Sequence, residues 1–145
     1  MTLLVPFDGS ALAEAALIRA VEFGEVFEQP VVAIAVLPEE NAAYARERGW
    51  IEPDESFDTG RILSRLREQV RDRAPEATFR YERVPRVARA GSIAREIRRT
   101  ARRIEASIVF VGSDNAGRLV TALSSVGGNV AADRTYDVLI VRHTG

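Results

Sequence analysis

The chain has 145 residues, of which 46% are hydrophobic and 28% charged, and its formal net charge is −1. This length and composition are those of one globular domain, and so small a charge provides no field that would recruit nucleic acid or an anionic membrane. The sequence contains neither cysteine nor lysine, which excludes disulfides, cysteine-ligated metals, a P-loop lysine and Schiff-base chemistry.

Predicted strands and helices alternate along the chain. In chain order, the first half predicts a strand over Leu3–Phe7, a helix over Ala11–Phe27, a strand over Val31–Leu37, a short helix over Asn41–Arg48 and a helix over Arg61–Arg73. The second half predicts a strand over Thr78–Val84, a helix from Gly91 to Ile104, a strand over Ile108–Val111, a short helix over Ser125–Asp133 and a strand over Val138–Arg142. Most of these strands are apolar along their whole length. The pattern favours an α/β fold with a doubly wound, five-stranded parallel sheet.

Four candidate residues lie at the carboxyl ends of the predicted strands. Asp8 follows the first strand, Val36 lies near the end of the second, and Gly112 and Ser113 follow the fourth. Ligands of doubly wound folds bind beyond these strand ends, so we expect the four residues to converge on one crevice. A structural alternative stays open for Asp8, because an aspartate between a strand and a helix often only stabilises the helix N-terminus.

The segment VFVGSDNAGRLVTALSSVGGNV, residues 109–130, has the features of a phosphate-binding turn. Gly112 and Gly117 permit close approaches of the backbone that a side chain would block. Ser113, Ser124 and Ser125 would supply hydroxyl donors to an anion site. The N-terminus of the helix predicted from Ser125 would direct its unpaired N–H groups into the same turn. The alternative is a glycine-softened connection between a strand and the last helix, since neither G-x-G-x-x-G nor the Walker pattern fits.

Other candidates are weaker. His143 is the only histidine, and no carboxylate or serine stands at a motif-like spacing from it, so we interpret it as a solvated residue. Five arginines lie opposite the apolar positions of one predicted helix, where exposed charge belongs: Arg95, Arg98, Arg99, Arg102 and Arg103. The sequence shows no metal-ligating cluster.

Five sequence runs, in this order, resemble the universal stress protein family: LLVPFDGS, VVAIAVL, ARAGSIAREI, SIVFVGS and SSVGGNV…YDVLIV. The similarity covers almost the whole chain. It implies one domain over residues 1–145, with a parallel sheet of strand order 3-2-1-4-5 in an adenine nucleotide alpha hydrolase-like fold. It also implies a homodimer through the last strand, with an interface formed by Val138, Leu139, Ile140, Val141 and Arg142.

Members of this family that bind ATP carry the pattern G-x2-G-x9-G-[ST] after the fourth strand. The resemblance aligns these positions with Gly112, Asn115, Ser124 and Ser125, so one glycine of three remains and one residue is missing between the last two. The adenine and ribose contacts of the family correspond to Asp8 and the backbone of Val36. The implied nucleotide-binding residues are Asp8, Val36, Gly112, Ser113, Asn115, Gly117, Ser124, Ser125 and Val126.

The resemblance implies a stress-response regulatory module that binds ATP or another adenine nucleotide, with Mg²⁺ present only beside a bound nucleotide. The alternative is a dimeric interaction module of the same fold that binds no nucleotide. An ATP-consuming enzyme is disfavoured, because no base or metal constellation accompanies Asp8. The N-terminal run lacks the features of a signal peptide and no apolar run has the length of a membrane span, so we expect a cytoplasmic protein. The role of the polar segment 39–60 stays open.

Overall fold

The computed structural model describes residues 1–87, 90–114 and 136–144 of the chain. Its strands are β1 (Thr2–Pro6), β2 (Val31–Pro38), β3 (Thr78–Val84), β4 (Ala106–Gly112) and β5 (Asp137–Val141). Its helices are α1 (Ala11–Phe27), α2 (Ala42–Glu47), α3 (Thr59–Arg73) and α4 (Ala90–Arg103). The predicted helix over Ser125–Asp133 lies outside the described residues.

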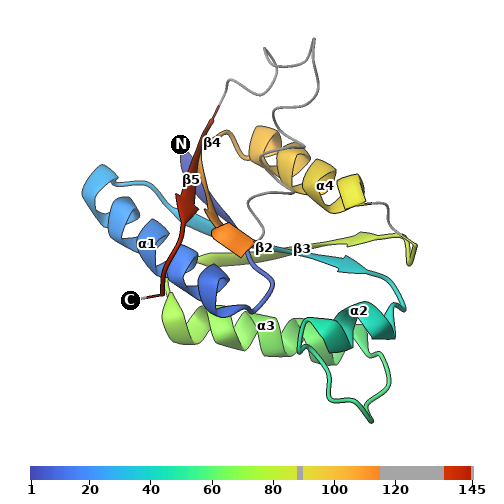
Figure 1. Cartoon of the computed structure of the whole chain (residues 1–145). Helices are drawn as coiled ribbons and strands as arrows, with labels where there is room; N and C mark the ends of the chain where they lie inside the picture. The colour runs from blue at the N-terminus through green and yellow to red at the C-terminus, as the bar shows by residue number, and fades with distance from the viewer. Residues whose placement is uncertain (88–89, 115–135, 145) are drawn as a thin grey trace.

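The described strands form one parallel sheet with the order β3-β2-β1-β4-β5, which confirms the predicted fold (Figure 1). From β1 the chain runs outward to β2 and β3, and then returns to the other side of β1 for β4 and β5. The strand order therefore reverses between β1 and β4. In open parallel sheets this reversal leaves a crevice at the carboxyl ends of the strands.

Helices cover both faces of the sheet, with α1 and α3 on one face and α4 on the other (Figure 1). Successive strand residues point to opposite faces, so Leu3 and Val5 enter the core under α1 and α3, whereas Leu4 enters the core under α4. Both faces of β1 are buried. This double burial is the reason why its sequence is a continuous apolar run.

The element bounds agree closely with the sequence patterns. Ser10 caps α1 as its side chain accepts a hydrogen bond from the N–H of Ala13. The last strand ends at Val141 instead of Arg142, whose side chain is exposed beyond the paired residues. None of the helices in the described ranges combines the length and apolar character needed to cross a membrane.

The polar segment 39–60 is not a plain loop. It contains α2, and three of its apolar side chains, Ala45, Trp50 and Ile51, are buried in the core beneath α1 and α3. Asn41 caps α2 by accepting from the N–H of Tyr44, and its amide donates to the carbonyl of Arg86. These contacts fix the segment against the core and against the residues that follow β3.

Candidate functional site

The structure brings four of the predicted site residues to the same end of the sheet. Asp8 follows β1, Val36 lies in the last part of β2, Gly112 ends β4 and Ser113 comes next. Because β1, β2 and β4 are parallel neighbours, their carboxyl ends share one edge. The other predicted residues, Asn115, Gly117, Ser124, Ser125 and Val126, lie outside the described residues.

Val36 presents its main chain, not its side chain, to this edge. The side chain is only 7% exposed and packs in the core under α4. The carbonyl of Ile34 accepts from the N–H of Phe7, so the backbone of Ile34 faces β1. Strand alternation directs the N–H and C=O of Val36 to the same side, beyond Pro6, the last β1 residue paired with β2. Main-chain groups at such a position suit recognition of a planar heterocycle edge.

Asp8 is held in a defined orientation. Its Oδ1 accepts from the N–H of Ser10 at 3.0 Å, and its Oδ2 accepts from Nη1 of Arg48 at 2.9 Å. Its carbonyl accepts from Nε1 of Trp50 at 2.7 Å. The carboxylate is 16% exposed. Asp8 therefore has a structural role in the turn that leads into α1, and it remains at the edge where a ligand would approach.

Sequence reasoning missed Arg48 and Trp50. Trp50 is 5% exposed, and its ring meets the ring of Tyr44 edge-on with centroids 5.5 Å apart. The guanidinium of Arg48 lies over the same Tyr44 ring, 4.9 Å from its centroid. One signal was present in the sequence: the only tryptophan of the chain stands inside a polar segment, where so large an apolar side chain is expected to find a buried place.

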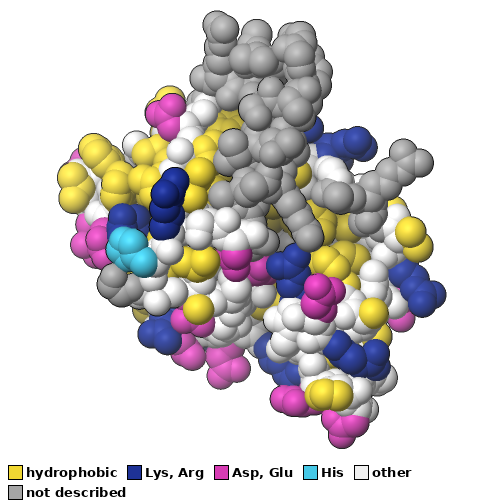
Figure 2. Space-filling view, viewed as in Figure 1, with side chains coloured by type: hydrophobic (Ala, Val, Ile, Leu, Met, Phe, Trp, Pro, Cys, Tyr) yellow, Lys and Arg dark blue, Asp and Glu magenta, His cyan; other side chains and the backbone are white. Residues whose placement is uncertain are grey.

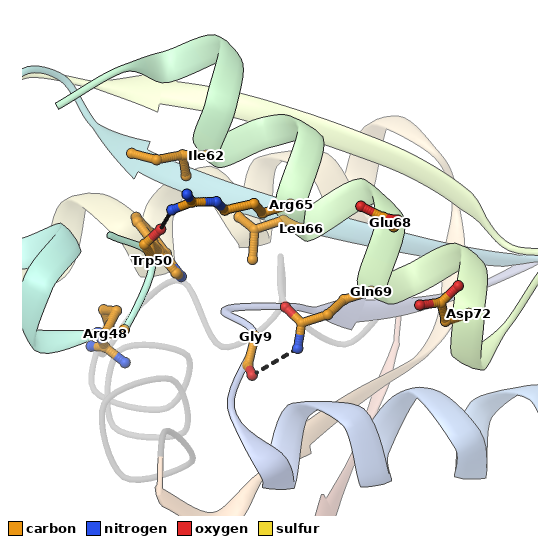
Figure 3. A pocket seen from close by; sticks show the side chains of 10 residues that line it. Gly9, Arg48, Trp50, Ile62, Arg65, Leu66, Glu68, Gln69 and Asp72 are labelled. Atoms are coloured by element: carbon orange, nitrogen blue, oxygen red, sulfur yellow. Dashed lines mark hydrogen bonds between the residues drawn. The ribbon is translucent and has the colours of Figure 1, made fainter. Parts of the chain in front are cut away.

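A cavity of about 440 Å³ lies between this turn and α3 (Figure 3). Trp50, Ile62 and Leu66 give it an apolar lining, and its charged lining residues are Arg48, Arg65, Glu68 and Asp72. Figure 3 shows Gln69 reaching from α3 to the turn, where its Nε2 donates to the carbonyl of Gly9 at 3.2 Å. Arg48 lines this cavity and also donates to Asp8, so it lies between the cavity and the turn after β1.

Gly112 has a steric reason to be glycine. A Cβ at this position would lie 2.8 Å from the Cβ of Leu12 and 3.2 Å from its carbonyl carbon. Side-chain and backbone atoms of Leu12 thus touch the end of β4 directly. The first turn of α1 packs against the strand end only because residue 112 has no side chain.

Strand β5 forms one edge of the described sheet and carries the predicted dimer residues. Ile140 is 39% exposed, whereas the side chain of Val141 is buried in the core beneath α1. Figure 2 shows hydrophobic side chains gathered over the part of the surface where α1 and β5 lie in Figure 1. In the described ranges, no group of three or more His, Asp or Glu residues is placed to hold a metal ion.

The parallel sheet, with its order reversing between β1 and β4 and helices on both faces, defines a doubly wound α/β domain. The chain belongs to the universal stress protein family, whose family model matches residues 1–142.

Solved structures of this family share the fold. A universal stress protein in complex with cAMP is 24% identical, covers 100% of this chain and 98% of its own, and gives a TM-score of 0.53. The universal stress protein from Archaeoglobus fulgidus in complex with dAMP is 19% identical, with 98% of each chain covered and a TM-score of 0.54. UspA from Lactobacillus plantarum is 18% identical, covers 98% of this chain and 97% of its own, and gives a TM-score of 0.58. The search of curated proteins found no match.

Proposed function

We propose that this universal stress protein is a cytoplasmic regulatory module, one domain over residues 1–145, that binds an adenine nucleotide such as ATP or AMP. The site lies beyond the carboxyl ends of β1, β2 and β4. The observation that carries the proposal is the pairing, at one sheet edge, of an oriented carboxylate, Asp8, with main-chain groups of Val36 directed past β1. A carboxylate suits ribose hydroxyls, and main-chain donors and acceptors suit the edge of adenine.

The relatives with cAMP and dAMP support an adenine ligand. Beyond the described residues, the predicted phosphate contacts would come from Asn115, Gly117, Ser124, Ser125 and Val126 together with Gly112 and Ser113. A Mg²⁺ ion would accompany only a bound nucleotide. The module would act through a ligand-dependent conformation or choice of partner instead of turnover.

Thermal unfolding with and without ATP, ADP and AMP tests the proposal. A ligand at 100 times its dissociation constant stabilises the folded state by about 2.7 kcal/mol, so nucleotides should raise the melting temperature in a concentration-dependent way. An unchanged melting temperature at millimolar concentrations of all three nucleotides would refute nucleotide binding and leave the nucleotide-free interaction module.

Two substitutions test the placement of the ligand. Asp8→Ala should weaken adenosine and ATP alike, because both carry the ribose. Ser125→Ala should weaken ATP more than adenosine, because Ser125 is proposed to contact phosphates. Titration calorimetry measures both, and equal losses for all ligands in Ser125→Ala would show that the phosphates lie elsewhere.

The proposal includes a homodimer formed by two β5 strands. The edge of β5 presents backbone donors and acceptors beside the exposed side chain of Ile140, and a second copy would pair with them. Val138, Leu139, Ile140, Val141 and Arg142 are the proposed interface residues, with the buried Val141 contributing main-chain contacts.

Charged substitutions test this interface. Ile140→Glu should convert the dimer to a monomer in analytical ultracentrifugation, and Val138→Glu should do the same. Tyr81→Glu is the matched control, because Tyr81 is 40% exposed on β3, the opposite edge of the sheet. A dimer that survives Ile140→Glu, or that Tyr81→Glu also breaks, would contradict the β5 interface.

A further inference from the structure

Asp8 lies between β1 and α1, but it is held by a part of the chain that belongs to neither element. Arg48 reaches Asp8 from the C-terminal end of α2, and Trp50 follows two residues later. Both residues belong to the segment between β2 and α3, some 40 residues away from Asp8 in the sequence. The carboxylate and the carbonyl of one residue are therefore fixed by the same short stretch.

That stretch is itself anchored. The Arg48 guanidinium rests on the ring of Tyr44, and the same ring meets Trp50 edge-on. The carbonyl of Trp50 accepts from Nη1 of Arg65 on α3 at 2.9 Å, a bond drawn in Figure 3. Arg48 is therefore held on its face by the Tyr44 ring and at its tip by Asp8, and it has few alternative rotamers. It therefore supports its partner with little entropic cost at the time of ligand binding.

We propose that Arg48 and Trp50 are positioning residues of the nucleotide site, which hold the Asp8 carboxylate ready to accept hydrogen bonds from the ribose hydroxyls. This inference rests on the proposed function and names two residues that deepen it. A carboxylate oxygen can accept two hydrogen bonds, so an arginine partner and a sugar hydroxyl are compatible on one group. Support of this kind keeps a binding group within the narrow geometry that affinity requires.

The experiment compares ligands that carry the 2′- and 3′-hydroxyls, which Asp8 would bind, with one that lacks them. Calorimetry measures adenosine, AMP and 2′,3′-dideoxyadenosine against the wild-type protein and Arg48→Gln. The variant should lose about tenfold in affinity for adenosine and AMP, the effect of one charge-assisted hydrogen bond. Its affinity for the dideoxy analogue should be unchanged, because that ligand has neither the 2′- nor the 3′-hydroxyl from which Asp8 would accept.

Two further variants make the comparison decisive. Arg48→Lys keeps the positive charge and should recover part of the adenosine affinity. Arg46→Gln is the matched control, because Arg46 lies in the last turn of α2, two residues before Arg48, but donates to the carbonyl of Glu55 and not to Asp8. It should bind all three ligands as the wild type does.

Trp50 provides a readout of its own, as the only tryptophan in the chain. Its Nε1–H is bonded to Asp8, so adenosine at saturation should change the tryptophan emission of the wild-type protein, and dideoxyadenosine should change it less. Trp50→Phe retains an aromatic ring without the donor and should lose adenosine affinity with the same selectivity as Arg48→Gln.

Each of the following results would overturn the inference about Arg48 and Trp50. Equal losses for all ligands in Arg48→Gln would show general support of the fold and overturn the inference, as would unchanged Trp50 emission at saturation. Tighter adenosine binding by the variant would show that Arg48 competes with the ribose, which also overturns it. A wild-type protein that binds none of the three ligands, nor ATP, would overturn the proposed function together with this inference, whereas binding without selectivity overturns the inference alone.

Discussion

The turn after β1 and the last residue of β4 both adjoin the first turn of α1, but they are held in opposite ways. The turn after β1, Asp8–Ser10, is fixed by hydrogen bonds from Arg48, Trp50 and Gln69. The end of β4 is fixed by close packing, with Gly112 against Leu12. The turn after β1 is held by polar groups from distant parts of the chain, whereas the end of β4 packs closely because residue 112 has no side chain.

Because of this difference, we expect the two regions to respond differently to substitutions and to a bound ligand. A hydrogen-bonded turn loses its support one bond at a time and can respond to a ligand that adds or replaces a partner. A close-packed strand end has no such gradation, because interiors tolerate extra atoms poorly. The polar turn is thus the adjustable part of the proposed site, and the β4 end is its rigid part.

The largest expected effect is at the centre of the polar network. Trp50→Ala removes a side chain that is 5% exposed and leaves the Asp8 carbonyl without this donor, and it should cost about 3–5 kcal/mol of unfolding free energy. Trp50→Phe retains the ring packing and should cost only about 0.5–1.5 kcal/mol. Urea denaturation followed by circular dichroism measures both, since the variants lack the fluorescent residue. A loss below about 1 kcal/mol in Trp50→Ala would show that the segment 39–60 is not anchored there.

The next effect tests the close-packed end of β4. Gly112→Ala places a Cβ 2.8 Å from that of Leu12 and should cost about 1–3 kcal/mol, because neither β4 nor α1 can move freely. Gly91→Ala is the control. A Cβ there meets nothing within 4 Å at the exposed start of α4, and helix propensity should make the change neutral or stabilising by up to about 1 kcal/mol. Equal effects of the two alanines in thermal unfolding would contradict the steric account of Gly112.

The two regions also differ in how far the sequence predicted them. The sheet order and most element bounds followed from apolar runs and helical spacing, which report local burial. The bounds of α1 and β3 agree with the prediction residue for residue. Gly112 and Asp8 were found because both stand next to a strand end, a position that the local pattern reveals.

Arg48 could not be found in this way. It is one of 20 arginines, and nothing in its neighbours distinguishes it from those on exposed helix faces. Its partner lies 40 residues earlier, and the pair exists only because α2 is capped and packed at the right place. Contacts between distant segments depend on tertiary packing, which spacing along one sequence does not encode. The end of the last strand was misjudged for a related reason, since Arg142 continues an apolar run but lies beyond the residues that pair with β4.

A smaller effect separates backbone strain from packing in the polar turn. Gly9 has φ +81°, and an alanine Cβ would lie 3.2 Å from Cδ2 of Leu66 and 3.0 Å from Oε1 of Gln69. Gly49 has φ +75°, and an alanine Cβ at this position would meet no atom within 4 Å. Gly49→Ala should therefore cost only the strain of a left-handed residue, about 1–2 kcal/mol, and Gly9→Ala somewhat more. A larger loss in Gly49→Ala than in Gly9→Ala, measured by urea denaturation, would contradict the packing of Gln69 and Leu66 over the turn.

The smallest effect concerns the outer layer of the polar network. Arg65, which donates to the Trp50 carbonyl, also donates to the carboxylate of Glu55, and so does Arg61. The hydrogen bond from Arg65, assisted by the N–H of Glu52, lowers the pKa of Glu55 from its ordinary 4.5 to about 2.

A pKa that is lower in the folded state means that ionised Glu55 stabilises the fold above its ordinary pKa, and that this contribution is lost as the pH falls from 4.5 towards 2. The effect should be small, because the guanidinium groups of Arg61 and Arg65 are about half exposed to solvent. Glu55→Gln removes the titrating group, so the difference in melting temperature between the wild type and this variant should be greatest near neutral pH and shrink across that acid range. A difference that stays constant from neutral to acid pH would show that Glu55 does not hold Arg65 in place beneath Trp50.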